Sequence, residues 1–190
     1  MSKIPERTNR YKQGLVDMIN YIDSISDKPV RMMNIVEVGV WTGCASVIFA
    51  KRFREVICVD TWKQAGGDHL TKKYNMKEVE KIFDSRMSKY PGIIRKAKMD
   101  SKQAAFASLI EKMENIETYD VIYIDAIHTF EGSLKDMRDW KPIAKRFICG
   151  HDYEKRFPGV IKAVNKVFGK PLKVFKDTSW VVKIKQGGKE

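Results

Sequence analysis

Acidic and histidine side chains recur where the apolar runs of this 190-residue chain end. Asp60 follows the run Val56–Val59, and Asp125 follows the run Tyr119–Ile124. Because the carboxyl ends of parallel strands meet at one rim of an α/β sheet, such groups should lie together although they are far apart in sequence. Gathered carboxylates and imidazoles can move protons, hold a divalent ion or hydrogen-bond a ligand. The expected rim set is Glu37, Asp60, Asp100, Asp125, His128, His151 and Asp152.

A glycine turn precedes Asp60 in the chain. The β-branched run Ile35–Val38 predicts a buried strand, and a helix with an apolar face follows Gly43. Gly39 allows a sharp turn and Gly43 allows a ligand to approach the backbone at the helix start. A carboxylate at Asp60 can accept hydrogen bonds from two ribose hydroxyls. The stretch therefore predicts a nucleoside site.

The glycine spacing separates two classes of nucleoside binder. Dinucleotide sites use G-x-G-x-x-G to hold a pyrophosphate, whereas this chain has Glu37-x-Gly39-x-x-x-Gly43. An acid before the turn repels phosphate and suits a cationic ligand. The pattern resembles the first motif of class I S-adenosylmethionine-dependent methyltransferases, which implies that the loop meets the methionine part and that Asp60 takes the ribose. The alternative is an ordinary strand–turn–helix unit with a solvated Asp60.

The resemblance runs from about Ile35 to Ile184. It implies that Asp100 and Ser101, which follow an expected strand over 92–99, meet the adenine amino group. Both residue types are also preferred helix N-caps, and the two roles are compatible. The cofactor-binding residues that the resemblance implies are Glu37, Gly39, Gly43, Asp60, Thr61, Trp62, Asp100, Ser101 and Asp125.

A second group of motifs, in the stretches 124–132, 150–153 and 157–160, resembles a branch of small-molecule O-methyltransferases that includes enzymes acting on sugars of antibiotics. In metal-dependent members, an acid after one strand and two adjacent acids after the next strand hold a divalent ion. A histidine three residues past the first acid is a base in some members. Asp125, His128 and Asp152 match this pattern, but His151 stands where an acid is expected.

Two chemical roles are thus predicted at the rim. His128 and Asp125 are the expected catalytic residues, with His128 as the general base, because imidazole titrates near neutral pH. Asp125, His151 and Asp152 are the candidate metal ligands, although Mg²⁺ prefers oxygen donors and His151 therefore weakens the case for it. The alternatives are a structural His128 and a His151–Asp152 loop that bonds its own backbone and closes the cofactor pocket.

The remaining elements predict how these residues are positioned. A leading helix is expected over 8–26, packed on the sheet or covering the cofactor cleft, and further helices are expected over 75–90 and 132–140. A closing pair of strands is expected over 172–175 and 180–184. The alternation predicts an α/β fold with a Rossmann-like, doubly wound, mostly parallel seven-stranded sheet and an antiparallel C-terminal edge strand. We expect one domain over 1–190, with a helical extension over 1–30 and the core over 33–185.

The composition indicates where the protein is located and what kinds of partner it could have. The hydrophobic content of 43% suits one sizeable core, and no apolar run approaches the ~20 residues that span a bilayer. A cytoplasmic protein without a membrane partner is therefore expected. The net charge of +12 favours an anionic partner or surface, but no nucleic-acid-binding signature accompanies it.

The leading prediction is methyl transfer from S-adenosylmethionine to an oxygen of a small-molecule acceptor, with a divalent metal such as Mg²⁺ as a possible second cofactor. A nucleic-acid methyltransferase is the alternative that the charge favours. A third class, a non-catalytic S-adenosylmethionine-binding protein, is favoured by the departure at His151. A homo-oligomer is compatible with each of them.

Overall fold

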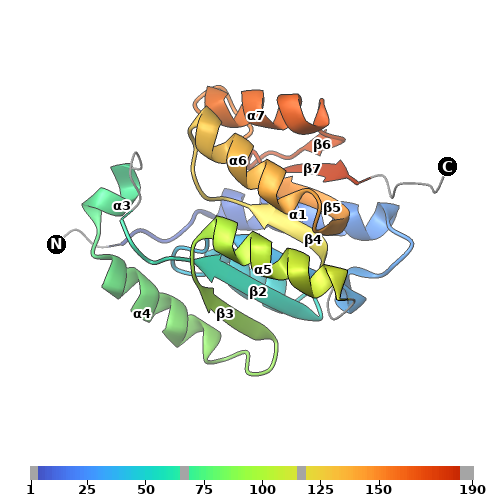
Figure 1. Cartoon of the computed structure of the whole chain (residues 1–190). Coiled ribbons are helices and arrows are strands. Elements are labelled where there is room, and N and C mark those ends of the chain that lie inside the picture. The colour runs from blue at the N-terminus through green and yellow to red at the C-terminus, as the bar shows by residue number, and fades with distance from the viewer. Residues whose placement is uncertain (1–3, 65–68, 115–118, 185–190) are drawn as a thin grey trace.

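Seven strands form a single sheet in the computed structural model, which describes residues 4–64, 69–114 and 119–184. The ends of the expected domain, 1–3 and 185–190, lie outside these residues. The strand order is β3-β2-β1-β4-β5-β7-β6 (Figure 1). The strands are β1 Asn34–Val38, β2 Glu55–Asp60, β3 Ile94–Lys98, β4 Tyr119–Ile124, β5 Ala144–Gly150, β6 Lys173–Val174 and β7 Trp180–Lys183.

The first five strands run parallel, and β7 pairs antiparallel with both β5 and β6. The predicted mostly parallel sheet with antiparallel pairing at its C-terminal side is confirmed. The structure refines one detail, because β7 lies between β5 and β6 and the short strand β6 forms the edge. Parallel strands need covered faces, which explains why every residue of β1 and β4 is buried.

Helices cover both faces of the sheet (Figure 1). One apolar cluster joins the sheet to α1, α2 and α4, and a second cluster joins it to α5, α6 and α7. Each helix contributes an apolar stripe to its cluster. The helices are α1 Asn9–Ile25, α2 Cys44–Ala50, α3 His69–Lys73, α4 Met76–Met87, α5 Ser101–Met113, α6 Phe130–Trp140 and α7 Pro158–Phe168, with a 3₁₀ turn at Val30–Met32.

The leading helix α1 begins after Thr8, whose side chain accepts a hydrogen bond from the backbone N–H of Tyr11. Its buried residues include Leu15, Met18 and Ile22, which recur at helical spacing and join the first apolar cluster. Through these residues α1 packs on the sheet, and its first turn reaches the rim where β1 and β4 end.

No helix within the described residues is long and apolar enough to cross a membrane.

Gly39 is required by the close approach of two strand ends. Its φ is +85°, and a Cβ there would lie 2.3 Å from the backbone oxygen of Asp125. Gly92 has a similar φ of +77° but open space around the same position. Both glycines therefore have a left-handed backbone that would strain any residue with a Cβ, but only Gly39 also lacks room for the Cβ.

We expect Gly39→Ala to lower the free energy of unfolding by ~2–5 kcal/mol, the sum of left-handed strain and overpacking. The matched variant Gly92→Ala should lose only ~1–2 kcal/mol, because strain alone applies there. Urea unfolding of both variants measures the difference. Equal losses would mean that the contact with Asp125 does not constrain the turn.

Candidate active site

A cavity of about 910 Å³ lies at the carboxyl ends of β1, β2 and β4. Gly39, Asp60 and Asp125, which follow or end these three strands, all line it. The opposite wall comes from the segment before α1 and from its first turn, including Arg7 and Tyr11. Strand ends and the leading helix thus enclose one space, as the rim rule for open α/β sheets predicts.

Asp60 holds the glycine turn as well as lining the cavity. Its Oδ2 accepts hydrogen bonds from the backbone N–H groups of Val40 (2.9 Å) and Trp41 (3.0 Å), and its Oδ1 accepts one from Trp62 (2.8 Å). Val40 and Trp41 follow β1, so the carboxylate joins the loop after β1 to the end of β2. The sequence suggested a ribose contact for Asp60 but not this bracing of the loop. Oδ2 already accepts two hydrogen bonds, so Oδ1, which accepts one, is the oxygen with a lone pair left for a ligand.

Three residues expected at the cofactor lie outside the cavity lining. Glu37 is 1% exposed and accepts a hydrogen bond from Ser46 Oγ at 2.5 Å, and burial raises the pKa of this carboxyl well above its ordinary value. Gly43, at φ +77°, leaves no room for a side chain against Phe83. Trp62 is buried, and its Nε1–H donates to the Trp41 carbonyl oxygen. Glu37 and Trp62 thus hydrogen-bond to neighbouring residues, and Gly43 packs against Phe83.

The structure places Thr61, Asp100 and Ser101 in the cavity lining. Asp100 is the N-cap of α5, and its side chain accepts a hydrogen bond from the backbone N–H of Lys102. Ser101 Oγ donates to Oδ1 of Asp136, an acid on α6 that also lines the cavity. Sequence reasoning did not select Asp136, because it lies within a helix and not at a strand end.

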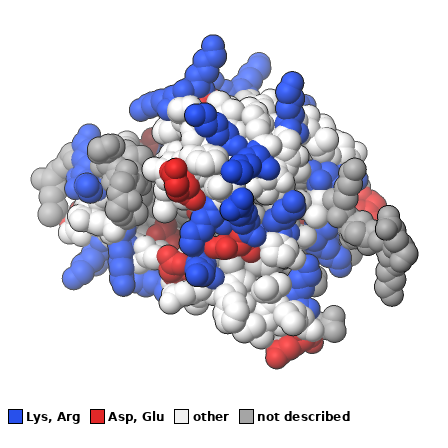
Figure 2. All heavy atoms as spheres, turned by 45° about the horizontal axis from the view of Figure 1, so that its top comes forward, with Lys and Arg blue, Asp and Glu red and all other residues white. Residues whose placement is uncertain are grey.

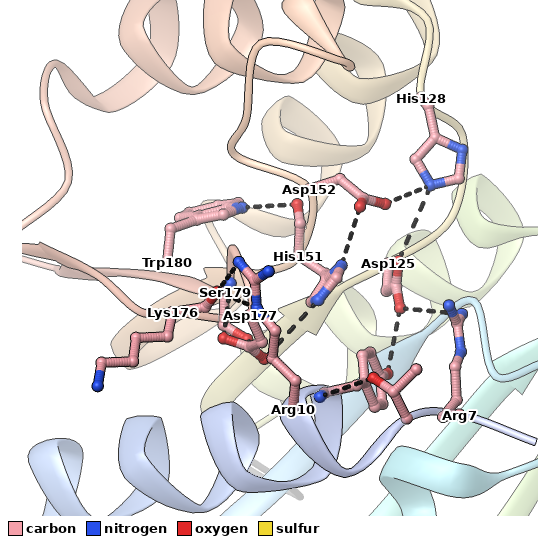
Figure 3. A network of polar contacts seen from close by, with 12 residues as sticks. Arg7, Arg10, Asp125, His128, His151, Asp152, Lys176, Asp177, Ser179 and Trp180 are labelled. Carbon is pink, nitrogen blue, oxygen red and sulfur yellow. Dashed lines mark hydrogen bonds and ion pairs between the residues drawn. The ribbon is translucent and has the colours of Figure 1, made fainter.

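Asp125, His128 and Asp152 form a compact cluster (Figure 3), of which Asp125 and His128 line the cavity. His128 Nε2 lies 2.7 Å from Asp152 Oδ2 and 3.9 Å from Asp125 Oδ1. The Phe157 ring packs against the imidazole with a centroid distance of 4.8 Å. One donor atom from each of the three residues lies within 4.8 Å of the others, an arrangement that can hold a metal ion.

His151 takes a different position from the one expected of a metal ligand. Its Nδ1 lies 3.0 Å from Asp152 Oδ1, and its Nε2 lies 3.7 Å from Asp177 Oδ2 (Figure 3). The ring also packs against Tyr11 at 4.9 Å. Asp152 has a φ of +63°, which turns its carboxylate between the two histidines. The compact group therefore contains His128, and His151 supports Asp152 from the side of α1.

Arg7 and Tyr11 contact the cluster from the N-terminal segment. Arg7 Nη2 lies 3.8 Å from Asp125 Oδ2, and Tyr11 Oη donates to the same oxygen at 3.4 Å. Arg7 also lies over the Tyr11 ring. Only the predicted helix over 8–26, with its option of covering the cleft, pointed to this contact, and nothing in the sequence singled out Arg7.

The cluster's charges hold one another in their ionised forms. Burial alone lowers the pKa of His128, but contact with Asp125 and Asp152 outweighs burial and raises it to about 10. Burial also acts against the charged form of Asp152, yet its contacts with His128 and His151 bring its pKa well below the ordinary range. Without a bound metal, His128 is therefore a cation between two carboxylates at neutral pH.

A comparison with known protein families identifies the family of this chain. A family profile described as a methyltransferase domain matches residues 36–153, more than half of the sequence. The chain belongs to the class I S-adenosylmethionine-dependent methyltransferases. A search of curated protein sequences finds no significant match.

Solved structures share the fold of this methyltransferase. A TDP-rhamnose 3'-O-methyltransferase of calicheamicin biosynthesis aligns with a TM-score of 0.62 and 13% identity, covering 93% of this chain and 81% of the other. The Methanococcus jannaschii fibrillarin pre-rRNA processing protein gives 0.58 and 16%, covering 98% and 83%. The magnesium protoporphyrin IX methyltransferase from Synechocystis with bound S-adenosylmethionine gives 0.54 and 10%, covering 95% and 85%. At these identities the likeness concerns the fold alone.

The methyltransferase's cavity has two chemically distinct sides. The sheet order places Asp60 at the end of β2, and the cluster of Asp125, His128 and Asp152 at the ends of β4 and β5, with β1 between them. One side offers hydrogen-bond acceptors in a braced loop, and the other gathers carboxylates and an imidazole. Methyl transfer is a displacement in which the protein aligns the nucleophile and removes its proton.

Proposed function

We propose that this methyltransferase transfers the methyl group of S-adenosylmethionine to a hydroxyl oxygen of a small-molecule acceptor. The cluster of Asp125, His128 and Asp152 carries this proposal, since a hydroxyl must lose a proton as it attacks the sulfonium methyl. The cavity of about 910 Å³ is of the size of small-molecule and cofactor sites. The sugar O-methyltransferase among the similar structures is consistent with an oxygen acceptor.

The cofactor would lie across the ends of β1 and β2. Asp60 would accept a hydrogen bond from the ribose at Oδ1, with Gly39 and Thr61 beside it and Asp125 at the boundary with the acceptor side. Asp100 and Ser101 line the part of the cavity that follows β3. Glu37, Gly43 and Trp62 would support the loop from beneath, which the burial of Glu37 and Trp62 and the packing of Gly43 against Phe83 favour.

The residues present fit a divalent ion. Asp125, His128 and Asp152 would hold it, and two carboxylates with one imidazole suit Mn²⁺ or another first-row ion as well as Mg²⁺, which prefers oxygen donors. A bound ion would supply positive charge next to the acceptor hydroxyl and so favour its ionised form. Tyr11 and Arg7 would keep Asp125 oriented through its other oxygen.

RNA is the second candidate acceptor, and the charge of the molecule favours it. Figure 2 shows Lys and Arg side chains spread over the face that α6 and α7 form, with few acids among them. Exposed members of this face are Lys135, Arg138, Lys141, Lys162 and Lys166. Lys135 also lines the cavity, so the basic face reaches the rim. Such a surface attracts phosphates without reading sequence.

The experiment is a transfer assay with S-adenosylmethionine labelled in its methyl group. It offers a panel of hydroxyl-bearing small molecules, among them nucleotide sugars and phenols, and separately total RNA, at low and high salt. We expect label in a small-molecule product whose methyl group resists mild alkali, as an ether does. Label found only in RNA, lost as salt rises, would replace this proposal with the RNA candidate. Label in an alkali-labile ester or on nitrogen would contradict a hydroxyl acceptor.

A further inference from the structure

Asp136 is a buried acid that lines the cavity, and the proposed methyl transfer gives it no role. It lies on α6, is 5% exposed, and lines the cavity together with Met99, Asp100 and Ser101. It takes no part in the cluster of Asp125, His128 and Asp152. A carboxyl buried without a paired cation is costly unless its hydrogen bonds are satisfied.

The hydrogen bonds of Asp136 have a fixed direction. The Trp140 indole can only donate, and its Nε1–H donates to Ser101 Oγ at 3.0 Å. The Ser101 hydroxyl hydrogen is thus free to donate to Asp136 Oδ1, which lies 2.7 Å away. This relay makes Oδ1 an acceptor. Within the described ranges no group hydrogen-bonds Oδ2, and Oδ2 is not sealed from solvent. Oδ2 is therefore the oxygen left to meet a ligand.

The position of Asp136 relative to Asp60 follows from the sheet order. Ser101 follows β3 and Asp136 lies on the helix that follows β4, while β2 and β1 lie between these two strands. A ribose held by Asp60 at the end of β2 would carry its base into the space bounded by Ser101 and Asp136. Both residues line the same cavity as Asp60.

Asp100 is a weaker candidate for reading the base. It caps α5, and its Oδ1 accepts the Lys102 backbone N–H at 2.9 Å, so that oxygen is committed to the helix start. Oδ1 of Asp136 is likewise engaged, by Ser101, but Asp136 is buried whereas Asp100 is exposed, so water competes less for the available Oδ2 of Asp136. Burial raises the pKa of Asp136 to about 6, which still leaves the carboxylate ionised above neutral pH.

We propose that Asp136 selects the adenine base of the cofactor by accepting a hydrogen bond from its exocyclic amine at Oδ2. This assignment rests on the proposed cofactor site and adds its base specificity. A base with a carbonyl oxygen in the same place would face the carboxylate with a second acceptor, and a polar site rejects a ligand that leaves its buried groups unpaired.

The test compares S-adenosylhomocysteine with S-inosylhomocysteine, in which a carbonyl replaces the amine. Calorimetry on the whole protein should show tighter binding of the adenine compound by roughly 10- to 100-fold, as one charge-assisted hydrogen bond predicts. Asp136→Asn should shrink or reverse this ratio, because the amide can donate to a carbonyl. The variant keeps an acceptor for Ser101 and loses a charge that burial disfavours, so it should fold, and a melting curve checks this.

Two further variants make the result specific. Asp139→Asn changes an acid on the same helix that pairs with Lys135, and it should keep the wild-type ratio. Asp100→Asn should also keep it. An unchanged ratio in Asp136→Asn, a ratio that moves in Asp100→Asn instead, or equal binding of both compounds by the wild type would each overturn the assignment and leave the proposed transfer intact. Binding of neither compound would overturn the proposed cofactor site together with it.

Discussion

Replacing His128 with alanine should slow methyl transfer by roughly 10²–10⁴-fold, the usual worth of positioned proton transfer. The affinity for S-adenosylhomocysteine should stay nearly unchanged, because His128 contacts Asp152 and Phe157 on the β4–β5 side and not the loop that Asp60 braces. The loss should appear in kcat. Single-turnover rates and calorimetry on the same preparation measure both quantities.

His128 could act as the base itself or as one of the residues that hold a divalent ion, and titration with Mn²⁺ separates these roles. The distances of His128 to Asp125 and Asp152 favour the second role, so we expect the alanine variant to lose Mn²⁺ affinity together with its rate. Retained Mn²⁺ affinity with a lost rate would make His128 the base. A wild-type rate in the variant would leave the imidazole with a packing role against Phe157.

His151→Ala is the matched comparison. His151 contacts Asp152 through Nδ1, but its ring packs under α1 beside Tyr11 and Asp177. Its removal should cost less rate than removal of His128, because Asp152 keeps its contact with His128. An equal or larger loss would show that both imidazoles serve the reaction and would favour His151 as the metal ligand for which the sequence made it a candidate.

The fold followed from the sequence because its signals are local. Buried β-branched runs such as Ile35–Val38 gave strands, and Thr8 gave a helix start. The rim rule then placed Asp60 and Asp125 at one cavity at the strand ends without any contact information, and Asp152 contacts His128 of the same cavity. The order of the strands along the chain and the positions where they end are enough to predict which residues lie at the rim, so the direction of each side chain was not needed.

The sequence could not show which of the two histidines, His128 or His151, lies with Asp125 and Asp152 in the compact cluster, because this depends on the direction of the side chains. Asp152 adopts a positive φ, and the residue before it, His151, points toward Asp177 while Asp152 turns to His128. Glu37 illustrates the same limit. It precedes the glycine turn as the motif requires, yet its carboxyl points beneath the loop to Ser46. Side chains alternate between the two faces of a sheet along a strand, but the sequence does not say which structural elements cover each face.

The sequence did not identify two cavity residues, Asp136 in the middle of a helix and Arg7 in the N-terminal segment, for a different reason. Asp136 reads as part of a polar helix face, and Arg7 lies in a charged segment before α1. Neither position is a strand end, and nothing local distinguishes them from solvated charges. Only the packing of α6 against Ser101, and of α1 against the sheet, brings them to the cavity.

Asp60→Ala should weaken binding of S-adenosylhomocysteine more than any other single change on the cofactor side. A charge-assisted hydrogen bond from a ribose hydroxyl to Oδ1 is worth ~1.5–3 kcal/mol, so losing it should lower the affinity by roughly 10- to 100-fold. Loosening of the loop adds to the loss, because Asp60 also holds the N–H groups of Val40, Trp41 and Trp62. Calorimetry measures the total.

A double-mutant cycle can divide this loss between the ribose and the loop. The 2′-deoxy and 3′-deoxy analogues of S-adenosylhomocysteine each remove one hydroxyl from the ligand. If Asp60 binds the ribose, the analogue that lacks the bound hydroxyl should lose affinity for the wild type but almost none for Asp60→Ala, with a coupling of ~1.5–3 kcal/mol. Equal losses in both proteins would mean no coupling. Asp60 would then act only by bracing the turn after β1, and the ribose would have to be held by another residue of the cavity.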